Sequence, residues 1–244
     1  MAAKIKKAKG IDKWRKKRYF SILAPKVFQE RELGQTLAYE PGELNGRCIS
    51  ANLMMLTGNI KRQNINMTFR VNKVQGDTAF AIVERYEVVP SAIKRKVRRQ
   101  KDRIDASFDC ITKDNKRIKI KPMIVTNSMV SRSIKSALRK EMIRTIALGT
   151  RTIDYDTVVI DIINEQFQRN IWASINKISP VRSVDIRIMK YLGDFTGNAD
   201  AFIQGVIGKA KIEEKKREAE EVPEEEAPAE EEAPAEEEQE TTEA

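Results

Sequence analysis

The segment IDASFDCITKDNKRIKIKPMI, residues 104–124, carries the clearest structural signal in this chain. Its apolar side chains alternate with polar ones on both sides of Asp114-Asn115, which is the period of strands that bury one face. A short polar turn between two alternating runs is typical of an antiparallel hairpin. The outward positions of the second run are basic: Arg117, Lys119 and Lys121. The segment therefore predicts an antiparallel hairpin at the centre of the fold.

Strand patterns also precede this hairpin. Residues 67–71 alternate in the same way, and a Gly-Asp turn at 76–77 leads to a strand with Phe80, Ile82 and Val88 on one face. Glycine, proline and asparagine pairs separate the earlier runs, as expected for turns. Those earlier runs, which we also expect to be strands, are residues 37–39 and 47–56.

The apolar period changes to that of helices after the hairpin. Residues 130–146 repeat apolar side chains at i, i+3 and i+4, and Gly149 is expected to end this helix. A second long helix over 159–175 is expected to follow, capped by Asp154 or Asp156. The second half of the chain is therefore predicted to pack two long helices against the strands.

A last alternating run near residues 184–188 predicts a closing strand. Strands and helices in separate blocks indicate an α+β domain, and 244 residues suffice for a real core. We place that domain at residues 19–192. The remaining segments are a basic arm (1–18), a linker of undecided structure that docks or frays (193–217) and an acidic Glu/Ala/Pro tail (218–244).

The charge of the chain is divided unevenly. Lys and Arg number 45 against 36 Asp and Glu, but residues 218–244 hold 14 glutamates and no basic residue. Residues 1–217 therefore carry 45 basic against 22 acidic side chains, a net charge of +23. A body this basic repels itself unless a polyanion neutralises it, which points to nucleic acid as its partner.

Composition also excludes several classes of function. The chain has no histidine, so histidine metal sites and Ser-His-Asp or Cys-His catalysis are excluded. Cys48 and Cys110 lie far apart without CxxC spacing, and we expect two buried thiols in a reducing compartment. No run of about 18 apolar residues occurs, and no apolar signal region follows the basic N-terminus. We therefore expect a soluble intracellular protein.

The basic arm combines cations with aromatic residues. It is too poor in apolar side chains to fold alone. Trp14 is suited either to stacking on an unpaired base or to packing, whereas Tyr19 and Phe20 more simply belong to the first strand or the core. The arm residues expected to bind nucleic acid are Lys13, Trp14, Arg15, Lys16, Lys17 and Arg18.

A dense basic cluster occupies residues 94–103. Ser91 is a plausible cap and Ile93 and Val97 form an i, i+4 apolar pair, so a short, mostly charged helix is predicted. A solvated surface helix is the simpler alternative, but like charges at this spacing repel one another unless an anion binds them. The residues expected to contact nucleic acid here are Lys94, Arg95, Lys96, Arg98, Arg99 and Lys101.

Three further cations, Arg132, Arg139 and Lys140, lie opposite the apolar stripe of the first long helix. They are candidates for the same surface, although any solvated helix exposes charge on that side. Catalytic candidates are fewer. A Mg²⁺ nuclease site from Asp154, Asp156 and Asp161 is conceivable, but the first two occupy positions of helix caps. Neither GxxxxGK[ST] nor GxGxxG occurs, so the usual nucleotide sites have no support.

Four stretches, in this order, resemble the S3Ae family of small-subunit ribosomal proteins. The resemblance covers about residues 13–193, and the short arm and the simple tail are similar to archaeal members. The four stretches are KKRYFSILAPKVFQERELGQTL (16–37), LNGRCISANLMMLTGN (44–59), DASFDCITKDNKRIKI (105–120) and SPVRSVDIRIMKYLG (179–193).

The resemblance implies a structural, non-enzymatic constituent of the small ribosomal subunit with no cofactor. It implies a β-barrel-like core with packed helices, and a place on the platform near the 3′ end of the small-subunit rRNA, on the mRNA exit side. The implied partners are this rRNA, neighbouring ribosomal proteins and, as a candidate contact, mRNA near the exit; the chain would be cytoplasmic and ribosome-bound.

The acidic tail leaves an alternative open. It is either a flexible solubilising segment or a mimic of nucleic acid that shields the basic body. A tail that competes with RNA would speed release, which favours a non-ribosomal RNA-binding or RNA-chaperone factor that acts transiently.

Overall fold

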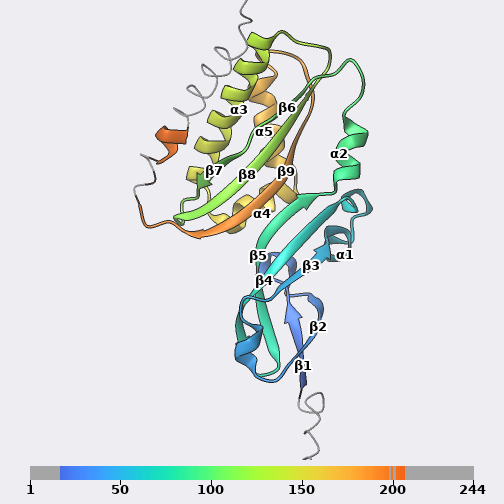
Figure 1. Ribbon diagram of the computed structural model, residues 1–244, viewed down its shortest axis with the longest axis vertical. Coiled ribbons are helices and arrows are strands. Elements are labelled where there is room, and N and C mark those ends of the chain that lie inside the picture. The colour runs from blue at the N-terminus through green and yellow to red at the C-terminus, as the bar shows by residue number, and fades with distance from the viewer. Residues whose placement is uncertain (1–16, 198, 200–201, 207–244) are drawn as a thin grey trace, which may run out of the picture.

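The computed structural model describes residues 17–197, 199 and 202–206 (Figure 1). Most of the predicted arm (residues 1–16), much of the predicted linker (198, 200–201 and 207–217) and the whole predicted tail (218–244) therefore lie outside the described residues. The strands are β1 Arg18–Leu23, β2 Glu32–Ala38, β3 Cys48–Asn52, β4 Ile65–Gln75, β5 Thr78–Val88, β6 Arg103–Asp105, β7 Phe108–Ile111, β8 Lys116–Thr126 and β9 Val181–Asp194. The α-helices are α1 Leu53–Thr57, α2 Pro90–Lys96, α3 Arg132–Thr152, α4 Tyr155–Ile163 and α5 Gln166–Ile175. Short 3₁₀ turns are η2 Lys26–Phe28, η3 Pro41–Leu44 and η4 Ile60–Arg62.

The strands form one mixed, nine-stranded sheet, which confirms the α+β class. Its order is β2-β1-β5-β9-β8-β6, with β4 and β3 added beside β5 and β7 beside β8. All pairs are antiparallel except β1 with β5. The long strand β5 reaches from the lower group, β1 to β4, to the upper group, β6 to β9 (Figure 1). The pairings among the described strands do not close this order, so the expected barrel-like core is not confirmed.

The two predicted hairpins are present. β4 and β5 meet at Gly76-Asp77, and β7 and β8 meet at a turn in which Asn115 adopts φ 56°. The alternating run that starts at Ile104 is interrupted between β6 and β7, although both strands keep one register on β8. The interruption lies opposite Pro122, which has no N–H to donate to a neighbouring strand.

In the first part of β5, the more buried face is the one opposite Phe80 and Ile82. Ala79, Ala81 and Val83 are buried, whereas Phe80 and Ile82 are half-buried. Both faces of this part of β5 carry apolar side chains, large ones on one face and small ones on the other. The sequence pattern therefore does not show which face is the more buried. In the structure, the small side chains face the core that surrounds Phe69.

The stretch expected to continue β3 as a strand forms the short helix α1 instead. The Asn52 side chain accepts a hydrogen bond from the Met54 N–H at 2.9 Å, and Gly58 ends the helix in the left-handed conformation. Leu53 and Leu56 are then buried on one side. Cap and stop residues thus override a strand-like apolar run.

Helix α3 passes through Gly149 and continues to Thr152, so the predicted stop is wrong. A Cβ atom at Gly149 would lie 3.4 Å from the Phe167 ring of α5. The glycine therefore serves close packing between two helices and does not end one. Buried residues of α3 include Leu138, Met142 and Ile146, as the periodicity predicted.

The second predicted long helix is two helices. Glu165 adopts φ 62° and separates α4 from α5, and the Gln168 side chain donates from Nε2 to the Ile162 carbonyl at 3.0 Å across this break. Asp154 occupies the N-cap position of α4, as one alternative predicted, but its side chain makes no capping hydrogen bond. The break turns the chain, so that α4 and α5 both bury apolar faces.

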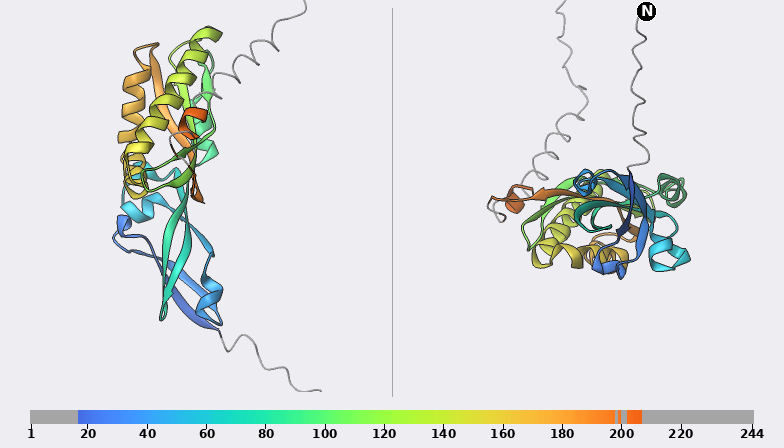
Figure 2. Two further views of the ribbon diagram at one scale, coloured as in Figure 1. Left: turned by 90° about the vertical axis from the view of Figure 1, so that its left-hand side faces the viewer. Right: turned by 90° about the horizontal axis from the view of Figure 1, so that it is seen from below.

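Helices α3, α4 and α5 lie together on one side of the upper strands and leave the opposite side open (Figure 2). Helix α2 covers part of that open side, because Ile93 packs with Met123 and Val125. Its N-cap position is Val89 with Pro90 as first residue, so the cap predicted at Ser91 is wrong. No helix among the described segments is long and apolar enough to cross a membrane.

The closing strand is confirmed and is longer than predicted, since β9 continues to Asp194. Beyond it, the rings of Phe195 and Phe202 lie 5.3 Å apart, and the Arg117 guanidinium lies 5.5 Å from the Phe202 ring. Ile203 is buried. The described part of the segment after β9 therefore packs against the body.

The two thiols differ in burial. Cys110 is buried as expected, and burial raises the pKa of its thiol to about 12. Cys48 is exposed, which corrects the expectation, because it lies on β3 and its Sγ donates to Glu84 Oε2 at 3.0 Å. The neighbouring Glu84 carboxylate raises the pKa of Cys48, so this thiol is poorly reactive as well.

Candidate nucleic-acid interface

The open side of the upper strands carries a row of cations that the strand register brings together. Lys119 of β8 lies opposite Lys190 of β9, which in turn lies opposite Arg85 of β5. Partners directly opposite in antiparallel strands project to the same face. The neighbouring row, Ile120, Met189 and Tyr86, is buried on the helix side, so the cationic row faces outward.

We call this surface the open sheet face (Figure 1). Beside the central row, further cations from β8 and β9 project from it. Like charges directly opposite in a sheet destabilise it, and a bound polyanion removes this repulsion. The basic residues of the open sheet face are Arg85, Arg117, Lys119, Lys121, Arg187 and Lys190.

Carboxylates neutralise part of this charge. Asp109 contacts both Arg117 and Lys119, the latter at 3.6 Å. Arg85 pairs with Glu87 at 2.7 Å. The cations outnumber these carboxylates, and their side chains remain partly exposed, for example 42% for Lys119. The face as a whole therefore remains basic.

Two arginines of this face have an unsatisfied donor. Arg187 contacts Asp105 at 3.3 Å through its terminal nitrogen, yet its Nε atom has no acceptor within the described structure. The Nε atom of Arg85 likewise has no acceptor among the described residues. Both Nε atoms are buried, so a phosphate would have to bind the terminal nitrogens of these guanidinium groups, which bind phosphate oxygens well.

The cluster predicted at residues 94–103 lies at the edge of the open sheet face. Helix α2 contains its first three cations, and Ile93 anchors the helix to β8. Lys96 pairs with Asp185 of β9, and Arg95 donates to Asn64 at 2.9 Å. Lys101 is half-buried, while Lys94, Arg98 and Arg99 are exposed. The cluster and the open sheet face thus form one continuous basic region.

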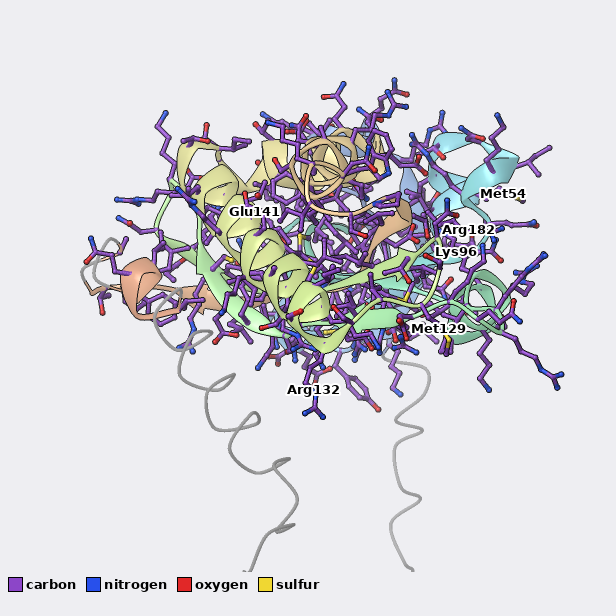
Figure 3. The ribbon with its side chains drawn as sticks, turned by 90° about the horizontal axis from the view of Figure 1, so that it is seen from above. Met54, Lys96, Met129, Arg132, Glu141 and Arg182 are labelled. Atoms are coloured by element: carbon purple, nitrogen blue, oxygen red, sulfur yellow. The ribbon has the colours of Figure 1, made fainter. Side chains whose placement is uncertain are left out.

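The cations of α3 lie beside the same region. Arg132 is the first residue of α3, is exposed and points toward the side of the open sheet face (Figure 3). Arg139 is half-buried, and its Nε donates to the Asp105 carbonyl of β6 at 3.4 Å. Lys140 is exposed on the same helix. The structure therefore places Arg139 against β6 and Arg132 on the side of the open sheet face.

Only two of the predicted arm residues, Lys17 and Arg18, belong to the part of the chain that the structure describes. Lys13, Trp14, Arg15 and Lys16 lie outside the described residues. Lys17 lies 5.3 Å above the Tyr39 ring, and Arg18 is exposed at the start of β1. Both lie at the opposite end of the molecule from α2 and β8 (Figure 1).

The predicted acidic candidates do not converge. Asp154 and Asp156 stand exposed at the start of α4, and Asp161 is half-buried later in that helix. Across the described ranges, no group of three or more cysteine and carboxylate side chains is placed to hold a metal ion.

Sequence reasoning missed most of the open sheet face as a site. Arg117, Lys119 and Lys121 were placed outward by alternation, but alternation alone gives no reason to join them to residues far along the chain. Lys190 and Arg85 become their neighbours through strand pairing. The alternating basic positions of β8 were the signal available in the sequence.

Comparison with known proteins identifies one family. The chain matches the model of the Ribosomal S3Ae family over residues 5–194. Over 171 residues it is 33% identical to the small ribosomal subunit protein eS1 of Halorubrum lacusprofundi, which covers 70% of this chain and 80% of that protein. It is 32% identical over 167 residues to eS1 of Nanoarchaeum equitans, covering 68% of this chain and 84% of that protein. With eS1 of Saccharolobus islandicus it shares 29% identity over 181 residues, 74% of this chain and 87% of that protein.

Proposed function

The chain belongs to the Ribosomal S3Ae family, and from that premise we propose that it is a structural constituent of the small ribosomal subunit that binds rRNA. Membership in a ribosomal protein family agrees with the resemblance seen in four sequence stretches and with a role without catalysis. The observation that supports RNA binding is the outward row of Lys119, Lys190 and Arg85, each opposite the next in register.

The basic region binds the RNA backbone and not particular bases. The cations project from a rigid sheet and from the anchored helix α2, so their spacing is fixed before binding. Fixed cations on a protein surface recognise the shape of folded RNA through its phosphates. The residues in this role are the open sheet face together with Lys94, Arg95, Arg98, Arg99 and Arg132, and the arm residues from Lys13 to Arg18 add further phosphate contacts.

The finer location follows the family resemblance. The chain sits on the platform near the 3′ end of the small-subunit rRNA, on the mRNA exit side, beside neighbouring ribosomal proteins and within reach of mRNA. It acts in the cytoplasm as a ribosome-bound protein.

Sedimentation of a cell lysate through a gradient at moderate salt tests this function. The expected result is that the chain co-sediments stoichiometrically with the small subunit and stays through a salt wash that strips loosely bound factors. A chain that remains at the top of the gradient, or leaves in mild salt, would instead be the transient RNA-binding or RNA-chaperone factor that the acidic tail allows.

A further inference from the structure

A cavity of about 410 Å³ lies where the lower strands meet helix α5, and it is separate from the open sheet face. Its walls come from η4, the end of β5, helix α2, the break between α4 and α5, and the start of β9. This volume is in the range of cavities that bind small molecules. The apolar residues of its walls are Ile65, Val88, Ala92, Ile162, Ile163 and Val184.

An oriented aromatic ring forms part of the wall. Trp172 is 43% exposed, and its Nε1–H donates to the Val181 carbonyl at 3.1 Å. This hydrogen bond holds the indole against β9 and leaves much of its surface uncovered. An exposed, fixed indole is a stacking surface for a nucleobase.

Three cations and two carboxylates, Glu165 and Asp185, line the same cavity. Lys61 and Arg169 line it and are exposed, and they come from different elements, η4 and α5. Lys96 of α2, labelled in Figure 3, also lines the cavity and pairs with Asp185. Basic side chains beside an aromatic, apolar cavity suit a ligand that has both phosphates and a flat ring.

Two acceptors in the wall lack donors. Gln168 is 8% exposed, and while its Nε2 donates to the Ile162 carbonyl, its Oε1 has no partner among the described residues. Asp185 Oδ2 is likewise buried without a partner there. Buried acceptors are normally satisfied, and because both residues line the cavity, a ligand that brings a donor would satisfy these oxygens. The exocyclic amino groups of adenine, cytosine and guanine are such donors, whereas uracil has no amino group and offers only its ring N3–H.

We infer that this cavity binds one unpaired nucleotide of RNA, with an amino-bearing base against Trp172 and its phosphates on Lys61 and Arg169. The inference rests on the proposed rRNA-binding function and adds a base-selective site to it. A neutral protein side chain is the rival occupant, and it would bring no anion to Lys61 and Arg169.

Intrinsic fluorescence tests the site, because the chain has two tryptophans and Trp14→Phe leaves Trp172 as the single reporter. The probes are hexauridylate RNAs with a central adenosine, uridine or abasic position. We expect adenosine to quench Trp172 and bind most tightly. In the full-length chain, Trp172→Ala should weaken binding of the adenosine probe by about 5- to 150-fold, the loss typical of one stacked base.

Exposed residues provide variants that do not disturb the fold. Lys61→Ala and Arg169→Ala should weaken binding of the adenosine probe, while Lys177→Ala, an exposed lysine just beyond α5, should not. Equal binding of the adenosine and abasic probes, or no change in Trp172 fluorescence while labelled RNA binds, would overturn the inference.

A photo-crosslinking residue in place of Arg169 separates RNA from protein in isolated subunits. A crosslink to rRNA supports the inference, and a crosslink to a neighbouring protein contradicts it. Failure of the nucleotide site and failure of the proposed function give different results. If the cavity variants keep wild-type selectivity in a chain that still enters subunits, the nucleotide site fails and the proposed function stands. If the wild-type chain is absent from subunits, the proposed function fails.

Discussion

Lys190 shows how a single residue can be unfavourable for stability and favourable for binding. It lies between Lys119 and Arg85 in the outward row of the open sheet face. A cross-strand neighbour of opposite charge would contribute a few tenths to about 1 kcal/mol, and Lys190 forgoes it on both sides, whereas Lys119 has Asp109 and Arg85 has Glu87. Such an arrangement is reasonable in a protein whose partner supplies the negative charge.

The variant Lys190→Glu is therefore expected to raise the stability of the free protein and to weaken RNA binding. Two like-charge neighbours become opposite-charge neighbours, which should add up to about 1 kcal/mol, or about 2–4 °C in Tm at low salt. Thermal unfolding and filter binding to an rRNA fragment measure the two effects.

Lys177→Glu makes the same change of charge at an exposed position just beyond α5, away from the open sheet face. It controls for net charge. If both variants bound RNA equally well, the open sheet face would have no special role.

At the scale of elements, Asp102 joins the start of α3 to the strands. Its carboxylate accepts from the Val130 N–H at 2.8 Å and pairs with Lys135 of α3 at 3.0 Å. The Asp102 N–H donates to the Thr126 hydroxyl of β8 at 2.9 Å. The Val130 N–H and then Lys135 hold the pKa of Asp102 below its ordinary value. The carboxylate thus fixes the direction in which α3 leaves the sheet.

Because the pKa of Asp102 is lower in the folded state, its ionised form stabilises the fold above the unfolded pKa of about 3.9. This contribution is lost as the pH falls through the folded pKa. We expect Asp102→Asn to lower the free energy of unfolding by about 1 kcal/mol at neutral pH, and the difference from wild type to shrink in strong acid. Urea unfolding at several pH values measures it. A difference that is independent of pH would contradict an ionic role.

The basic residues of helix α2 and of the segment after it are expected to bind rRNA. Replacing Lys94, Arg95, Arg98 and Arg99 by alanine should leave the Ile93 contact with β8 intact and reduce incorporation into subunits. A matched variant removes four exposed cations elsewhere: Lys26, Lys113, Arg144 and Lys177. Quantitative mass spectrometry of purified subunits compares the two. Normal incorporation of the α2 variant would show that this cluster does not bind rRNA.

The whole molecule separates its charges. Residues 1–217 have a net charge of +23, and residues 218–244 contribute 14 glutamates. Binding to RNA should therefore weaken steeply with salt, because each phosphate contact releases bound counterions. The logarithm of the association constant should fall linearly with the logarithm of salt concentration.

The acidic tail is expected to compete with RNA for the basic body. Deleting residues 218–244 should tighten non-specific RNA binding at low salt, and the effect should fade as salt screens the charges. A tail of equal length with every glutamate replaced by glutamine should behave like the deletion. If only the deletion tightened binding, the tail would act through its bulk and not through its charge.

The sequence by itself determined the features that depend on neighbouring residues. Alternation and turn residues predicted both hairpins, the 3.6-residue period predicted α3, and composition predicted a basic body. These signals are local, because side-chain direction in a strand or helix repeats over a few residues. The family, too, was recognisable from short stretches in order.

Tertiary structure alone decided what depends on distant partners. Gly149 packs against Phe167 instead of ending a helix, and Glu165 breaks one apolar run into two helices that both reach the core. Strand pairing places Arg85 beside Lys190, more than one hundred positions later. The cationic row and the cavity at Trp172 arise from such long-range contacts, because register and packing, and not local propensity, decide which surfaces meet.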